Sequence, residues 1–145
     1  MSRLNARALF IVVLMAFALS ACSPVSAQLV DEDAAYTSEN VDAILESIDT
    51  GDVEGRPVTE AEELRTAALV SLRNQGDDGT GIADLITATF PPDTRGVPVY
   101  AERATFNGQD AWVVIEVIGR EGGTLEDMRL WVLSDDGEIL YSANR

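Results

Sequence analysis

The sequence predicts an α+β domain in which about three N-terminal helices pack on a four-stranded antiparallel meander. Apolar residues recur at helical spacing over 38–90, whereas β-branched and aromatic residues dominate 97–143. The dipeptides Asn107-Gly108 and Asp136-Gly137 are typical of two-residue hairpin turns. A run of helices followed by a run of antiparallel strands favours helices gathered on one face of a single sheet.

Three helices are expected before the prolines at 91 and 92. The first, over 38–50, follows the i, i+3, i+4, i+7 spacing of apolar residues. The second, over 59–75, begins with the capping box formed by Thr59 and Glu62. The third, over 82–90, ends because proline cannot continue a helix.

The strands are expected at 97–106, 111–118, 125–134 and 138–143. Residues 130–142, LWVLSDDGEILYS, resemble the strand, acidic turn and strand that end PepSY-like exported modules. The resemblance covers about a dozen residues and implies neither a fold nor an inhibitory activity.

The N-terminus has the layout of a secretory signal peptide over residues 1–21. Arg3 and Arg7 supply a positive segment, Ala8 to Leu19 form an uncharged apolar run, and small residues follow at 20 and 21. A transmembrane helix is the weaker alternative, because the run is shorter than the roughly 20 residues that a bilayer core requires.

Leu19-Ser20-Ala21-Cys22 resembles the lipobox of a bacterial lipoprotein precursor. The resemblance implies cleavage before Cys22, a diacylglycerol on its thiol, and acyl chains such as palmitate that hold the protein on the extracytoplasmic side of the cell membrane. Two acyl chains satisfy the requirement for lasting attachment. Ordinary secretion is the alternative, with cleavage after Val25-Ser26-Ala27 and a free chain that begins at Gln28.

Charge and composition limit the partners of the remaining chain. The sequence has 25 acidic and 10 basic residues, all of them arginine, for a net charge of −15. Removal of the signal peptide leaves eight arginines and a net charge of about −17. This charge opposes binding to nucleic acid and close approach to an anionic lipid surface. We expect residues 22–36 to form an acidic tether and residues 37–145 a single domain.

A search for catalytic groups returns mainly exclusions. The chain has no histidine or lysine and no disulfide partner for its one cysteine, which excludes most hydrolase dyads and histidine zinc sites. The acidic turns do not fit a calcium loop. The register set by the Asn107-Gly108 turn places Glu102 opposite Val113 and Glu116 opposite Val99, so the two glutamates lie on opposite faces. No catalytic residue, metal or cofactor is therefore predicted.

Four residues form a candidate binding surface. Arg103 is expected opposite Trp112, and Arg129 shares a face with Trp131, which favours two cation–π pairs. If Val113 and its apolar neighbours face the helices, both tryptophans look outward. The prediction is a non-enzymatic envelope protein that binds a protein or glycan partner there. The alternatives are a carboxylate enzyme such as a glycan hydrolase, or a plainly secreted structural domain whose tryptophans merely cover the sheet.

Overall fold

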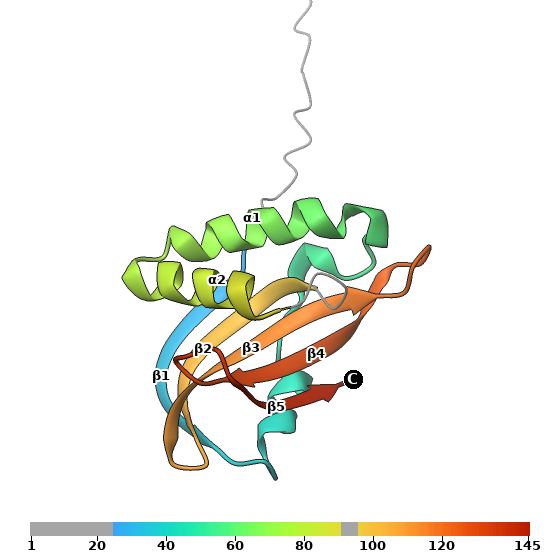
Figure 1. Ribbon diagram of the computed structural model, residues 1–145. Coiled ribbons are helices and arrows are strands. Elements are labelled where there is room, and N and C mark those ends of the chain that lie inside the picture. Colours follow the sequence, from blue (N-terminus) through green and yellow to red (C-terminus); the bar gives the residue numbers. More distant parts are fainter. Residues whose placement is uncertain (1–24, 91–95) are drawn as a thin grey trace, which may run out of the picture.

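The computed structural model describes residues 25–90 and 96–145 (Figure 1). The predicted signal peptide and Cys22 lie outside the described residues. The described chain forms strands, α-helices and short 3-10 segments in the order β1 (Gln28–Tyr36), η1 (Val41–Glu46), η2 (Gly51–Val53), η3 (Val58–Glu60), α1 (Ala61–Arg73), α2 (Asp77–Thr89), β2 (Val97–Phe106), β3 (Gln109–Gly119), β4 (Leu125–Leu133) and β5 (Ile139–Asn144).

The described residues form a mixed sheet of five strands in the order β1-β2-β3-β4-β5. Strands β2 to β5 form an antiparallel meander, but β1 pairs with β2 in parallel. The predicted fold class is therefore wrong. The helices do not precede the sheet but lie inside the connection from β1 to β2, because parallel neighbours need a long crossover between them.

The predicted tether over residues 22–36 is corrected by β1. Gln28 to Tyr36 form a strand at the sheet edge, and Val25 and Ala27 are already buried before it. The acidic run within β1 favoured the prediction of a tether. An edge strand, however, pairs through its backbone and can carry charged side chains that face solvent. The ladder to β2 shifts register between Asp31 and Ala34.

The first predicted helix also differs from the structure. Only Val41–Glu46 is helical there, and its geometry is 3-10. The capping box of Thr59 and Glu62 is wrong too, because the single turn η3 precedes α1 and no side chain caps that helix. The third helix, α2, starts five residues earlier than expected, at Asp77.

Both faces of the sheet are covered. Figure 1 shows α1 and α2 on one side of the sheet and η1 on the other. On the far side, Asp42 of η1 accepts a hydrogen bond of 2.9 Å from the Tyr141 hydroxyl of β5. The Leu45 carbonyl accepts a 3.3 Å hydrogen bond from Arg145. The central strands β2 and β3 are consequently buried on both faces over most of their length.

The two α-helices pack closely at their shared turn. A Cβ at Gly79 would lie 2.0 Å from the Leu72 carbonyl oxygen, so only glycine fits at this crossing. None of the helices in the described ranges is long and apolar enough to cross a membrane.

Candidate functional site

The two predicted arginine–tryptophan pairs are present on the sheet. Arg103 lies opposite Trp112 in the β2–β3 ladder, with its guanidinium 5.2 Å from the ring centroid. The Arg129 guanidinium lies 5.3 Å from the ring of Trp131. Strand pairing alone predicts both contacts, because residues directly opposite each other, or two apart on one strand, share a face.

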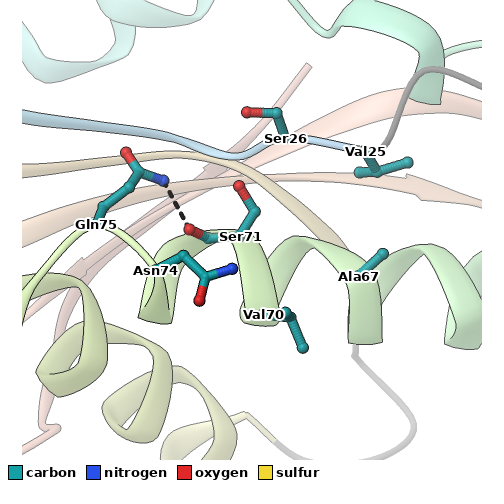
Figure 2. Close-up of a pocket in the computed structure, with 7 residues that line it drawn as sticks. All are labelled: Val25, Ser26, Ala67, Val70, Ser71, Asn74 and Gln75. Carbon is teal, nitrogen blue, oxygen red and sulfur yellow. Dashed lines mark hydrogen bonds between the residues drawn. The ribbon is translucent and has the colours of Figure 1, made fainter.

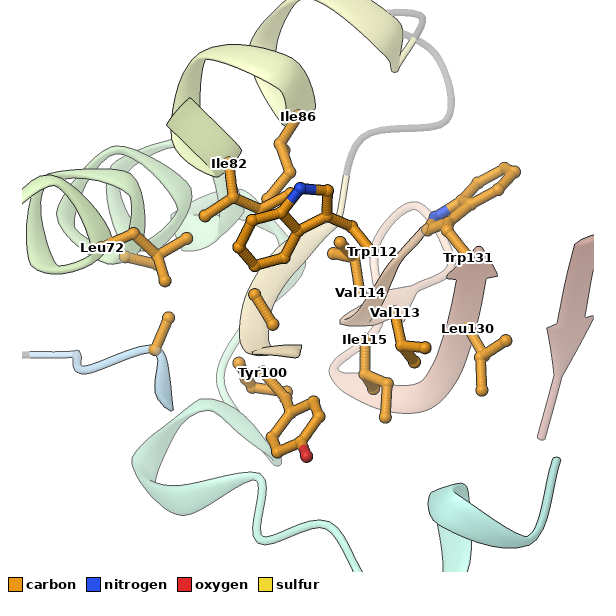
Figure 3. Close-up of a cluster of buried hydrophobic side chains, with 14 of the residues drawn as sticks. Leu72, Ile82, Ile86, Tyr100, Trp112, Val113, Val114, Ile115, Leu130 and Trp131 are labelled. Carbon is orange, nitrogen blue, oxygen red and sulfur yellow. The ribbon is translucent and has the colours of Figure 1, made fainter. Parts of the chain in front are cut away.

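The orientation predicted for these pairs is wrong. Trp112 points toward Ile82 and Ile86 of α2 (Figure 3), and Trp131 stacks on Phe90 at 4.9 Å. Both tryptophans are buried, with 5 % and 9 % of their surface exposed. They cover the sheet beneath the helices, so the described structure offers no exposed aromatic surface at these positions.

The same helix-facing side buries Glu116. Arg65 of α1 donates from Nη1 to the Glu116 carboxylate at 2.8 Å and to the Gly96 carbonyl at 2.6 Å. The indole Nε1 of Trp131 donates to the other carboxylate oxygen at 3.1 Å. Glu116 is completely buried and Arg65 is 4 % exposed, so this cluster is closed to solvent.

Burial dominates the electrostatics of Glu116. Loss of water raises the pKa of this carboxyl, and the charge and hydrogen bond of Arg65 act in the opposite direction. The Arg65 Nη2 atom is buried and has no hydrogen-bond partner among the described residues. The cluster therefore holds α1 on the sheet at an energetic cost and presents nothing to a ligand.

The opposite face carries a second buried glutamate. The hydroxyls of Tyr36 and Tyr100 both donate to Oε2 of Glu102, at 2.9 Å and 3.0 Å. Glu102 is 2 % exposed and forms no ion pair with any residue that the structure describes. Two neutral donors therefore take the place that Arg65 occupies at Glu116.

The two tyrosines keep their protons at neutral pH. Burial, the hydrogen bond to Glu102 and the Glu102 charge raise the pKa of Tyr36 to about 12. Burial and then the Glu102 charge raise the pKa of Tyr100 well above its ordinary value. Both hydroxyls are therefore fixed as donors to Glu102.

A pocket of about 370 Å³ opens beside this cluster, between β1, β2 and the segment that contains η1. It is lined by Gln28, Val30, Glu32, Ala34, Tyr36, Ile44, Ser47, Ile48, Asp49, Tyr100 and Glu102. Among the described residues, the lining combines three carboxylates with apolar walls and includes no arginine. No group of three or more metal-ligating side chains suited to a metal ion occurs in the part of the chain that the structure describes.

A larger and less polar groove of about 550 Å³ lies between α1 and the residues that precede β1 (Figure 2). Its lining consists of Val25, Ser26, Ala67, Val70, Ser71, Asn74 and Gln75. None of these side chains is charged, which is unusual in a chain with 25 acidic residues.

The residues that complete both glutamate clusters, namely Arg65, Tyr36 and Tyr100, are not among the residues predicted from the sequence. Arg65 lies between Leu64 and Ala68 in the buried stripe of α1, which is a signal that a buried acid must face it. Tyr100 lies two residues before Glu102 on one strand, so the two share a face. Tyr36 could not be found, because it falls in the stretch interpreted as a tether.

Comparison with family models, curated proteins and solved structures finds no match to this chain.

Proposed function

We propose that this protein is a lipid-anchored, extracytoplasmic and non-enzymatic binding module whose Glu102 pocket takes an organic ammonium group. The observation that carries the binding proposal is a carboxylate that is 2 % exposed, lacks an ion pair within the described chain and borders an open pocket. A buried carboxylate gains most from a cation that replaces its lost hydration.

The hydrogen-bonding capacity of the cluster selects for donors. Each tyrosine hydroxyl has one proton, and both protons are used on Glu102. What remains are acceptors, namely the lone pairs of the two phenol oxygens and of the carboxylate. An ammonium group with three N–H donors matches these acceptors, whereas an anion finds only repulsion.

The remaining lining supports the same class of ligand. Glu32 and Asp49 add negative charge, and Ile44 and Ile48 offer an apolar wall for an alkyl chain. The volume falls at the lower end of the range for small-molecule sites. A lysine side chain of an envelope protein, or an amine on an envelope glycan, has this combination of alkyl or sugar body and cationic head.

The binding proposal is tested by calorimetric titration of the purified protein with n-butylammonium chloride. Glu102→Gln should weaken binding at least about tenfold, because it removes the charge while its amide oxygen still accepts from the tyrosines. The control is Glu46→Gln, which removes the same charge from an exposed position on η1 outside the lining. Equal binding by wild type and Glu102→Gln, or binding of n-butyrate instead, would contradict the proposal.

The anchoring proposal rests on the signal-peptide layout and on Leu19-Ser20-Ala21-Cys22. Intact mass of the protein extracted from membranes should show a chain that begins at Cys22 and carries a diacylglycerol. Cys22→Ser should release the protein from the membrane fraction. A native chain that begins at Gln28, or one with an unmodified Cys22 thiol, would contradict anchoring and favour plain secretion.

The structure does not favour the alternative of a carboxylate enzyme that would use Glu102 and Glu116. Glu102 and Glu116 lie on opposite faces of the sheet, one among tyrosines and the other under α1, so they cannot act on one substrate. A β-bulge at Val99 also shifts the partner of Glu116 from Val99 to Pro98. The pair therefore does not form the two-carboxylate arrangement that glycoside hydrolysis uses.

A further inference from the structure

The groove between α1 and the residues that precede β1, the α1 groove, lies where the described chain begins. Val25 and Ser26, the first described residues, form one of its walls, and Ala67 and Val70 of α1 form the other (Figure 2). Val70 is 49 % exposed, which makes it one of two large hydrophobic residues exposed in the described chain.

The start of β1 is fixed to the end of α1. The Gln75 side chain donates to the Ala27 carbonyl at 2.9 Å and accepts from the Leu29 amide at 3.2 Å. Ala27 is 1 % exposed and Val25 is 9 % exposed. The described chain is thus held on the folded domain from Val25 onward.

Covalent geometry then limits the distance from the predicted lipid to the groove. Three residue steps separate Cys22 from Val25, and an extended chain spans at most about 3.6 Å per residue. The Val25 end of the groove wall therefore lies within about 11 Å of the lipidated residue. Val25 and Ala27 are buried in the folded domain, so they do not form a flexible tether that would let an acidic globule stand off the bilayer.

We infer that the α1 groove, rather than any other face, lies against the headgroups of the bilayer that holds the Cys22 lipid, an inference that rests on the proposed anchoring. The occupant is lipid, because the chain length leaves no space for a protein layer between the groove and the anchor.

The charge distribution agrees with this orientation. The groove lining is uncharged, so its approach to the headgroups brings no acidic side chain of the lining into a region of low dielectric. Val25 and Ser26 also line a second pocket, which contains Asp49 and Asp52, so of these two hollows only the α1 groove has an uncharged lining among the described residues. The Glu102 pocket, on the opposite face of the sheet, remains open to the aqueous side.

Cysteine labelling tests the orientation in the full lipidated protein. Because the diacylglycerol occupies the Cys22 thiol, Val70→Cys supplies the one free thiol, which is labelled with an environment-sensitive fluorophore. The matched control is Ala43→Cys, an exposed residue of η1 on the other side of the sheet. Each protein is reconstituted in phosphatidylcholine vesicles that contain spin-labelled phosphatidylcholine.

Spin-labelled lipid should quench the label at position 70 at least about threefold more strongly than the label at 43, and aqueous iodide should show the reverse order. Equal quenching at the two positions would overturn the orientation. Intact mass of the same samples separates the two proposals. A lipidated protein with equal quenching refutes only the orientation, whereas an unlipidated Cys22 refutes the anchoring and with it the orientation.

Discussion

The two faces of the sheet each bury one glutamate, and they satisfy it in different ways. On the helix side, Glu116 is paired with Arg65 and receives a further hydrogen bond from Trp131. On the η1 side, the only hydrogen-bond donors to Glu102 among the described residues are the hydroxyls of Tyr36 and Tyr100, and Glu102 borders a pocket. One charge is neutralised inside the protein, and the other is stabilised but not neutralised.

This difference separates a structural acid from a candidate ligand-binding acid. A buried ion pair holds elements together, and its loss leaves an uncompensated charge in the core. A buried carboxylate held by neutral donors still attracts a cation from outside. A change at the Glu116 cluster should therefore lower stability, whereas a change at the Glu102 cluster should alter ligand binding.

The largest expected effect follows removal of the cation from the closed cluster. Arg65→Ala leaves the Glu116 carboxylate buried without its partner and should lower the free energy of unfolding by about 3–5 kcal/mol. Urea denaturation measures the loss. The double variant Arg65→Met with Glu116→Leu should recover most of it, because an apolar pair of similar volume needs no charge partner. A single variant as stable as wild type would show that the ion pair does not hold α1 on the sheet.

A smaller loss is expected when Trp131 no longer donates to Glu116. Trp131→Phe keeps an aromatic ring against Phe90 but removes the indole N–H, and should cost about 1.5–3 kcal/mol, the range for hydrogen bonds to charged groups. Thermal unfolding checks this value. In the Glu116→Gln background, Trp131→Phe should lower the free energy of unfolding by less. An unchanged loss would show that the effect comes from packing and not from the hydrogen bond.

The cluster of Glu102, Tyr36 and Tyr100 should be detectable in the alkaline titration of tyrosine. The folded pKa of Tyr36, about 12, exceeds its ordinary value of 10.0, so the folded state binds this proton more tightly. The resulting stability is complete below pH 10 and is lost as the pH rises through about 12. Near-ultraviolet absorbance of tyrosinate follows the titration.

Glu102→Gln sharpens this measurement. It removes the charge that helps to raise the pKa of Tyr36, while burial remains, so the midpoint should fall toward 10.0 without reaching it. The exposed control Glu46→Gln should leave the midpoint where it is. An identical titration in wild type and Glu102→Gln would contradict the described contact.

The smallest effect is expected at the rim of the sheet. Arg103 forms an ion pair of 3.1 Å with Asp135, and both side chains are more than a third exposed. Asp135→Asn should change the free energy of unfolding by less than about 1 kcal/mol, because water screens exposed pairs. A loss of stability as large as that expected for Arg65→Ala would contradict the difference between the buried and the exposed ion pair.

Sequence reasoning succeeded where local chemistry decides the structure. Asn107 and Gly108 adopt φ of 49° and 84°, as a tight hairpin requires, and the register that follows pairs Arg103 with Trp112. The prediction failed where a segment distant in the sequence determines which side chains are buried. Alternation cannot tell which face of β3 meets the helices, because η1 covers the other face and both faces are buried.

The candidate site could not be predicted from the sequence because its residues meet only through long-range strand pairing. The sequence places Glu102 on the face opposite Glu116, but its partner Tyr36 is 66 residues away on a strand whose charged sequence does not look like one. Only the parallel pairing of β1 with β2 brings the two together. The helix-side cluster has a similar origin, since Arg65 and Glu116 are separated by 51 residues.

The central claim, that Glu102 and its tyrosines bind an ammonium group, is tested most directly by nuclear magnetic resonance of the tyrosine rings. Titration with n-butylammonium should shift the ring resonances of Tyr36 and Tyr100, leave Tyr141 unmoved, and produce no shifts with n-butanol. Shifts at all three tyrosines, no shifts at Tyr36 and Tyr100, or equal shifts with n-butanol would contradict the claim.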